Sequence, residues 1–167
     1  MSFKRCGLHI KPAIVACLIV IIDQITKAAV VKHLILYRTI PVIDGFFNLT
    51  HIHNPGGAFG FLANQSQIVR SFFFLIVSFA AMVFIVYFYC KTPKKYFFFR
   101  VCLAMIFGGA LGNLIDRIRL GKVVDFLDFY IGNLHWPAFN IADSAITIGI
   151  VIYVFHIFFN KVPEFGK

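Results

Sequence analysis

The chain has 167 residues, 60% of them hydrophobic, with 22 phenylalanines and a mean hydropathy of +0.85. Water-soluble domains are not built from such a composition, so we expect an integral membrane protein and exclude a soluble enzyme or binding module. The formal net charge of +9 would suit a nucleic-acid partner, but most of the cations lie on one side of the apolar segments, and we expect no nucleic acid to bind.

Four segments are long and apolar enough to cross a bilayer as helices, which takes about 20 residues for ~30 Å of hydrocarbon. They cover residues 12–36, 68–90, 97–115 and 138–159. Few residues remain outside them, so we expect one membrane domain over residues 1–167 and a mainly α fold, an integral membrane four-helix bundle. The longer connecting segments, residues 37–67 and 116–137, fall on the same side of the membrane.

Charged residues orient these segments. Nine cations lie on one side of the membrane: Lys4, Arg5, Lys11, Lys91, Lys94, Lys95, Arg100, Lys161 and Lys167. The positive-inside rule places that side, with both termini, in the cytoplasm. Five aspartates lie on the opposite, outer side: Asp44, Asp116, Asp125, Asp128 and Asp143. The outer face is therefore where we expect the chemistry.

The first span ends in DQITK, where Asp23 and Lys27 stand one helical turn apart on the same face. The simpler interpretation is an i, i+4 ion pair that stabilises the end of the helix. The alternative is that the pair also orders a polar site at the outer end of the bundle, because ionisable groups within a membrane are costly.

The segment after the first span, RTIPVIDGFFNLTHIHNPGGAFGFL, is rich in β-branched and aromatic residues. Turn signals at residues 44–45 and 54–57 predict a small hairpin-like sheet lying on the membrane surface. Gly56 and Gly57 would let the backbone approach another group closely. A turn with a purely structural role explains the same glycines.

The third span contains Gly108 and Gly112 in a G-x-x-x-G pattern, which permits close contact between helices. It ends in GNLIDR, so Asn113, Asp116 and Arg117 are expected at the outer membrane boundary. The run VVDFLDFYI that follows, residues 123–131, has the composition of a strand.

The outer aspartates are candidates for acid–base chemistry. Two carboxylates in a water-poor place can share one proton, because two like charges a few ångströms apart cannot both ionise cheaply. In an aspartic protease, the charged carboxylate takes a proton from water while the neutral one donates to the scissile carbonyl.

Local context narrows this set. Asp116 lies beside Arg117, which favours a structural salt bridge, and Asp44 precedes Gly45 in a turn. Asp125 and Asp128 would point to opposite faces of a strand unless a bulge intervenes. Apolar neighbours of Asp125 favour its protonated form, whereas the helix dipole favours ionised Asp143. As a hypothesis, Asp125 carries the shared proton and Asp143 begins as the base.

Other chemistries have less support in the sequence. The H-E-x-x-H helix of zinc proteases is absent, and His51 and His53 lack an obvious third ligand, so we expect neither a metal nor another cofactor. Ser144 has no His or Lys nearby in the sequence. Cys6, Cys17, Cys90 and Cys102 fall in or near the cytoplasmic half, where we expect no disulfides.

Five motifs occur in order: DQITK at 23–27, NPGGAFG at 54–60, GGALGNLIDR at 108–117, VVDF at 123–126 and FNIAD at 139–143. Together they resemble the bacterial lipoprotein signal peptidase family, signal peptidase II, over essentially the whole chain. The resemblance implies a multi-pass enzyme of the inner membrane with a small extramembrane β-sheet cradle and an active site at the periplasmic face.

The resemblance also implies roles for particular residues. The catalytic dyad would be Asp125 and Asp143, with Asp23 and Lys27 in supporting roles. The residues expected to line the site and contact substrate are Asn54, Gly56, Asn113, Arg117 and Asn140.

The implied reaction is removal of the signal peptide from diacylglyceryl-modified prolipoproteins, with the cut immediately before the lipidated Cys. The implied partners are these prolipoproteins, membrane lipids and a cyclic peptide inhibitor such as globomycin, and we expect a monomer. Two non-catalytic alternatives stay open from the residues alone: a membrane carrier or proton-relay subunit, and a scaffold that binds lipidated signal peptides.

Overall fold

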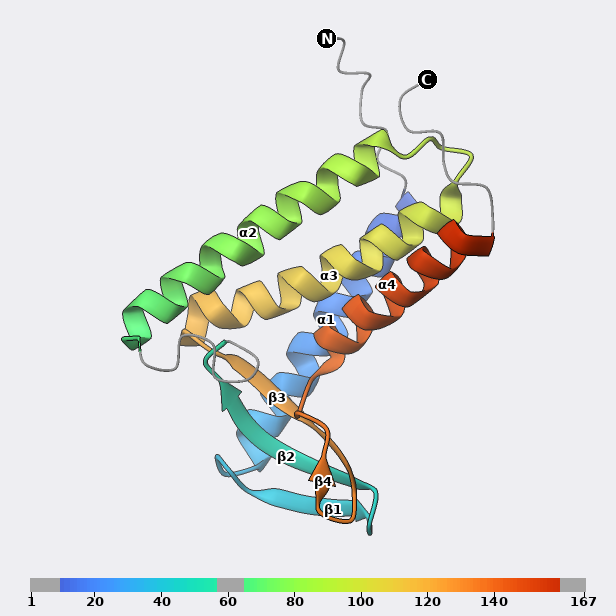
Figure 1. Ribbon diagram of the computed structural model, residues 1–167. Coiled ribbons are helices and arrows are strands. Elements are labelled where there is room, and N and C mark those ends of the chain that lie inside the picture. The colour runs from blue at the N-terminus through green and yellow to red at the C-terminus, as the bar shows by residue number, and fades with distance from the viewer. Residues whose placement is uncertain (1–9, 57–64, 160–167) are drawn as a thin grey trace.

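The computed structural model describes residues 10–56 and 65–159 and is mainly helical (Figure 1). Its four helices are α1 (Ile10–His33), α2 (Gln67–Lys91), α3 (Phe97–Leu120) and α4 (Ile141–Phe159). Each is long and apolar enough to cross a membrane. The predicted four-helix membrane fold is therefore confirmed. The start of α1 and the end of α4 lie at one end of the bundle, and the sheet lies at the other (Figure 1).

Helix α3 is the centre of the bundle, because it contacts α1, α2 and α4, whereas α2 contacts no other described helix. Glycines allow this close packing. A Cβ at Gly108 would lie 2.8 Å from the carbonyl oxygen of Ala16, and one at Gly109 would clash with the carbonyl oxygen of Ala142. A Cβ at Gly112 would lie 2.6 Å from Oδ2 of Asp23. The predicted close contact at Gly108 and Gly112 is confirmed.

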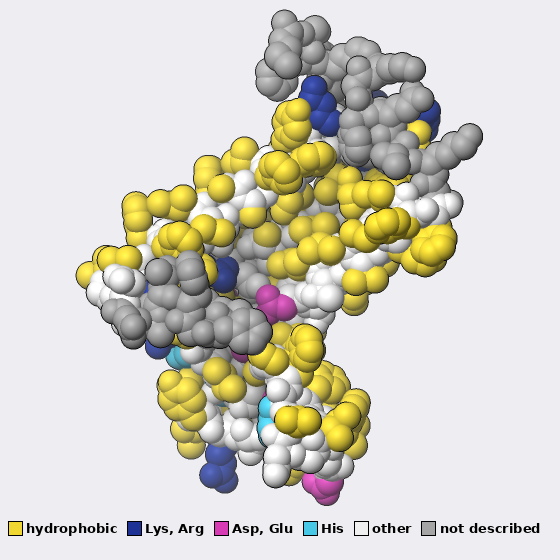
Figure 2. Space-filling model, in the orientation of Figure 1, with side chains coloured by type: hydrophobic (Ala, Val, Ile, Leu, Met, Phe, Trp, Pro, Cys, Tyr) yellow, Lys and Arg dark blue, Asp and Glu magenta, His cyan; other side chains and the backbone are white. Residues whose placement is uncertain are grey.

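The outer surface of the helices is hydrophobic, as Figure 2 shows in yellow. Helix α2 has no buried residue among those described, and Ile76, Phe79 and Val83 on it are exposed. Large apolar side chains in contact with solvent would be costly in water but suit the hydrocarbon of a bilayer.

The small sheet forms at one end of the bundle from segments far apart in the sequence. Its strands are β1 (Thr39–Ile43), β2 (Phe47–Asn54), β3 (Val123–Ile131) and β4 (Leu134–His135), in the order β1-β2-β3-β4. All pairings are antiparallel, and a register shift separates Leu49 from Ile52 in β2. The β1–β2 hairpin and the strand at 123–131 agree with the sequence predictions.

A small core joins the sheet to the bundle. Val30 and Leu34 near the end of α1 pack against Val124 and Phe126 of β3. Because these side chains are all less than a tenth exposed, the strand that carries Asp125 is held firmly against the membrane helices.

The helix ends differ from the expected spans most clearly at three places. Helix α1 ends at His33 and not at residue 36. Helix α3 continues to Leu120 and ends at Gly121, whose φ of 69° is left-handed, so Asp116 and Arg117 are helical residues. Helix α4 begins at Ile141 and not at residue 138, because the chain first pairs with β3 through Phe139.

The expectation about disulfides is wrong. Cys90 in α2 is disulfide-bonded, while Cys17 and Cys102 are free. The sequence argument concerned the compartment, but a disulfide also requires two sulfur atoms to lie close together, and only the fold decides that.

Candidate active site

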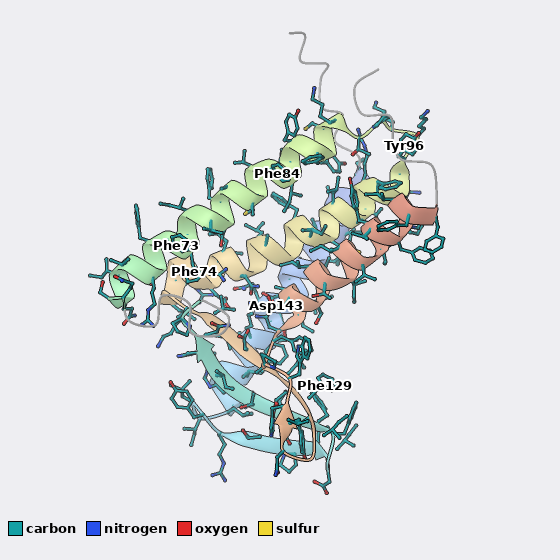
Figure 3. All side chains as sticks on the ribbon, in the orientation of Figure 1. Phe73, Phe74, Phe84, Tyr96, Phe129 and Asp143 are labelled. Carbon is teal, nitrogen blue, oxygen red and sulfur yellow. The ribbon has the colours of Figure 1, made fainter. Side chains whose placement is uncertain are left out.

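Asp125 and Asp143 come together because the chain folds back along β3 before α4 begins. The backbone N–H groups of Phe126 and Leu127 donate to the carbonyl oxygen of Phe139, at 3.0 and 2.8 Å, and Phe139 donates back to Leu127 at 3.0 Å. The next residue, Asn140, therefore lies beside β3. Figure 3 shows Asp143 at the start of α4, next to the sheet.

Asn140 and Asp143 form a reciprocal cap at the start of α4. The Asp143 N–H donates to Oδ1 of Asn140 at 3.0 Å, and the Asn140 N–H donates to Oδ2 of Asp143 at 3.3 Å. This arrangement satisfies backbone donors that the first helical turn leaves unpaired, and it holds the Asp143 carboxylate in one orientation.

The amide of Asn140 also contacts the second carboxylate. Its Nδ2 donates to Oδ1 of Asp125 at 2.7 Å, and it lies 3.1 Å from Oδ1 of Asn113 and 3.2 Å from the carbonyl oxygen of Val124. The Asn140 side chain is fully buried. One amide thus joins both aspartates, which is the feature that defines this site.

Two further amides complete the surroundings of the pair. Asn113 Nδ2 donates to Oδ1 of Asp143 at 2.7 Å, and Asn54 Nδ2 donates to Oδ2 of Asp125 at 3.0 Å. Every carboxylate oxygen of the pair therefore accepts a hydrogen bond from a neutral group. Amide donors hold the carboxylates in place without the full neutralisation that a direct ion pair would bring.

Asp125 has an unusual proton affinity. Its side chain is 2% exposed. Burial, and then the negative charge of Asp143, raise the pKa of Asp125 to about 7, although the amides of Asn54 and Asn140 and the charge of Lys27 act in the opposite direction. Near neutral pH, Asp125 therefore gains and loses a proton readily, as a general acid must.

Gly56 and Arg117 lie on the side of the site that faces α2. The Gly56 N–H donates to Oδ1 of Asn54 at 2.9 Å, which turns the Asn54 amide so that its nitrogen faces Asp125. The φ of Gly56 is 93°, and a Cβ there would clash with the ring of Phe74. The Arg117 guanidinium lies 5.9 Å from the centroid of the same ring and donates to Oγ of Ser78 at 3.3 Å.

Asp23, Lys27 and Asp116 form a buried ionic cluster next to the two aspartates. Lys27 Nζ lies 2.9 Å from Oδ2 of Asp23, 2.9 Å from Oδ2 of Asp116 and 2.9 Å from Oδ1 of Asn113. The predicted Asp23–Lys27 pair is confirmed. Asp116 is in a salt bridge, but its partner is Lys27 and not the neighbouring arginine.

The other sequence candidates lie apart from the pair. Asp128 accepts from Asn48 at 2.9 Å and contacts His135 at 2.8 Å, and Asp44 is in the β1–β2 turn. His51 contacts the carbonyl oxygen of Leu34 at 2.8 Å and His53 at 3.2 Å. Among the described residues, no three His, Cys, Asp or Glu side chains are placed to hold a metal.

Comparison with known proteins decides the family. Residues 15–159 match the family model for signal peptidase (SPase) II. The chain belongs to the signal peptidase II family. It is 56% identical to the lipoprotein signal peptidase of Desulforapulum autotrophicum, over 93% of this chain and 96% of that one, and 50% identical to that of Syntrophus aciditrophicus, over 84% and 88%.

Solved structures agree with this assignment. A bacterial membrane enzyme determined by the in meso method at 1.9 Å resolution matches with a TM-score of 0.79 and 34% identity, over 97% of this chain and all of that one. A second such structure, at 2.3 Å, gives a TM-score of 0.78 and 35% identity, over 94% of each chain.

Membership in the signal peptidase II family settles the broad activity. The protein is a multi-pass bacterial membrane protein and a membrane aspartic protease that removes signal peptides from prolipoproteins. The predicted family and enzyme class are confirmed, and the carrier and scaffold alternatives are not supported.

Three residues around the signal peptidase II site were not predicted. Gln24 Nε2 donates to Oδ2 of Asp23 at 3.1 Å and to Oδ1 of Asp116 at 3.0 Å. A polar side chain inside a predicted membrane span was the feature of the sequence that could have identified Gln24. Phe74 and Ser78, which contact Arg117, gave no signal because aromatic and small hydroxyl residues are ordinary in a membrane helix.

Proposed function

We propose that Asp125 and Asp143 are the catalytic pair of this signal peptidase II. We propose further that it cuts diacylglyceryl-modified prolipoproteins immediately before the lipidated Cys, at the periplasmic face of the inner membrane. The observation that carries the proposal is the pair of carboxylates, Asp125 buried and Asp143 partly buried, joined by Asn140 and bonded only to neutral donors at each oxygen.

The proposed reaction uses one proton shared by the pair. Ionised Asp143 takes a proton from a water molecule, whose oxygen adds to the scissile carbonyl carbon while protonated Asp125 donates its proton to the carbonyl oxygen. The tetrahedral diol then collapses. The C–N bond breaks, the amine of the lipidated Cys takes the proton held by Asp143, and one diol hydroxyl returns its proton to Asp125.

Substrate binding is proposed for Asn54, Gly56, Asn113, Arg117 and Asn140. Asn113 and Asn140 are buried and donate to the aspartates, so their role is chiefly to orient the pair. Asn54 is exposed, and Arg117 is held beside Phe74 by Ser78. Asn54 and Arg117 are therefore the residues best placed to hydrogen-bond an extended peptide.

A lateral approach of the substrate suits the arrangement of the helices. Helices α2 and α4 both contact α3 but not each other. An acidic side chain reaches the surface between the helices and the sheet (Figure 2), where Figure 3 labels Asp143. We propose that the signal helix enters from the lipid bilayer between α2 and α4, so that its scissile end meets the pair.

The proposal includes partners. We propose that the protein acts as a monomer, because the two aspartates and the amides that bond them form a complete hydrogen-bond network within the chain. Membrane lipids would surround the exposed apolar side chains. A cyclic peptide such as globomycin would compete with the substrate.

The substrate proposal is tested with purified protein in detergent micelles and one prolipoprotein, with and without its diacylglyceryl group. We expect cleavage of the lipidated form only, with mass spectrometry placing the cut immediately before the modified Cys. Globomycin should inhibit, and a chelator should have no effect. Equal cleavage of the unmodified form would refute the lipid requirement, and loss of activity with a chelator would point to a metal enzyme.

The raised pKa of Asp125 predicts the pH dependence of this reaction. Since protonated Asp125 is the proposed donor and its pKa is about 7, the rate should fall as the pH rises above that value. An aspartate with an ordinary pKa of about 3.9 would already have lost its proton. The measurement is kcat/KM from about pH 5 to about pH 9. A rate that stays constant up to the alkaline end would contradict the assignment of Asp125 as the proton donor.

A further inference from the structure

The buried ionic cluster contacts the backbone immediately before each proposed catalytic aspartate. Asp23 Oδ1 accepts from the N–H of Ala142 at 3.0 Å, and Ala142 precedes Asp143. Asp116 Oδ2 accepts from the N–H of Val124 at 3.1 Å, and Val124 precedes Asp125. Lys27 lies between the two acids and bonds both. A single ammonium group therefore connects the start of α4 with β3.

The third contact of Lys27 orients an amide of the site. Its Nζ donates to Oδ1 of Asn113, so Nδ2 of Asn113 faces Asp143. In the reversed orientation, the amide nitrogen would face the ammonium, donor against donor, and the amide oxygen would face the Asp143 carboxylate. Lys27, together with the Asn140 Nδ2 donor at 3.1 Å, thus fixes which group Asn113 presents to Asp143.

The charge of Lys27 acts on the same pair. The side chains of Asp23, Lys27 and Asp116 are almost fully buried. With one cation and two acids, the cluster carries one net negative charge, and removal of the lysine charge would double it. Within residues 10–56 and 65–159, the ionisable groups around the pair are Asp23 and Lys27 on α1 and Asp116 and Arg117 on α3, while β2 contributes the neutral Asn54.

We infer that Lys27 is a positioning residue of the reaction, which fixes the relative placement of Asp125 and Asp143 through its contacts with Asp23, Asp116 and Asn113. This inference rests on the proposed catalytic role of the two aspartates. An ion pair that only stabilised the helix end would leave kcat unchanged once the protein is folded.

The test compares Lys27→Met with the double variant Lys27→Met/Asp23→Asn, which keeps the net charge of the cluster. The matched control is Lys32→Met, which removes an exposed lysine from the same helix. For Lys27→Met we expect kcat to fall about 10- to 100-fold with little change in KM. The alkaline limb of its pH profile should move to higher pH, because the pair then holds its proton more tightly. The double variant should keep the reduced kcat with the alkaline limb near the wild-type position.

The inference is overturned if folded Lys27→Met has the kcat or the alkaline limb of the wild type. Thermal unfolding in micelles establishes which variants are folded. If the single variant does not fold, the double variant decides, and a wild-type kcat there overturns the inference. Asp125→Asn, assayed alongside, separates the two proposals. If Asp125→Asn is active, the proposed catalytic pair is wrong. If Asp125→Asn is inactive while Lys27→Met cleaves at the wild-type rate, only the role of Lys27 is refuted.

Discussion

Asp125→Asn and Asp143→Asn should each lower the rate of prolipoprotein cleavage by roughly 10²- to 10⁴-fold, the usual contribution of general acid–base catalysis. The substitution keeps the size of the side chain but removes the group that gains and loses the proton. KM should change much less, because the carboxylate oxygens of Asp125 and Asp143 are not the main proposed contacts for the peptide. The measurement is kcat and KM with a diacylglyceryl-modified prolipoprotein in micelles.

Asp128→Asn is the matched control for this prediction. Asp128 lies on the same strand as Asp125 and is also buried, but its partners are Asn48 and His135. Its amide variant should cleave substrate at close to the wild-type rate. Near-normal cleavage by either Asp125→Asn or Asp143→Asn would show that the catalytic pair is assigned wrongly.

Asn140→Ala should lower kcat about 10- to 100-fold, because its amide orients Asp125 and a misplacement of about 1 Å in a catalytic group can cost roughly 100-fold in rate. The variant loses the donor to Asp125 and the acceptor that caps α4. Loss of the cap alone should lower the free energy of unfolding by about 1 kcal/mol. Activity and thermal unfolding are measured on the same preparation.

Two further variants separate the roles of Asn140. Asn140→Ser keeps a hydroxyl that can cap the helix, so it should recover much of the stability but little of the activity. Asn48→Ala removes a comparable amide bond to Asp128 and should leave cleavage unchanged. If Asn140→Ser is fully active, the amide contact with Asp125 has no part in the reaction.

Much of this protein was predictable from local patterns. The apolar lengths of the spans indicated the four helices, and turn signals with β-branched residues indicated the β1–β2 hairpin. The ordered motifs indicated the family, which the comparisons confirm. The placement of Asn54, Asn113 and Asn140 around Asp125 and Asp143 agrees with the expected site, whereas their roles in the reaction stay proposals.

The partner of Asp116 shows where local reasoning fails. Arg117 is adjacent in the sequence, but consecutive residues on a helix do not face each other. Asp116 points instead to Lys27 on another helix, at 2.9 Å. Similarly, Phe74 and Ser78 on α2 looked like ordinary membrane-facing residues until the structure placed them beside Arg117.

The sequence by itself determined that this is a membrane protein, which segments are helical and which end carries the polar groups. These properties follow from the composition of each segment and the spacing of its apolar residues, because the free energy of transferring a segment into hydrocarbon depends mainly on its own residues. Tertiary structure alone decided that one amide joins Asp125 to Asp143 and that one lysine bonds Asp23 and Asp116 in the buried cluster beside them. Those contacts depend on how closely α3 packs against α1 and α4 at its glycines, and therefore on residues far apart in the chain.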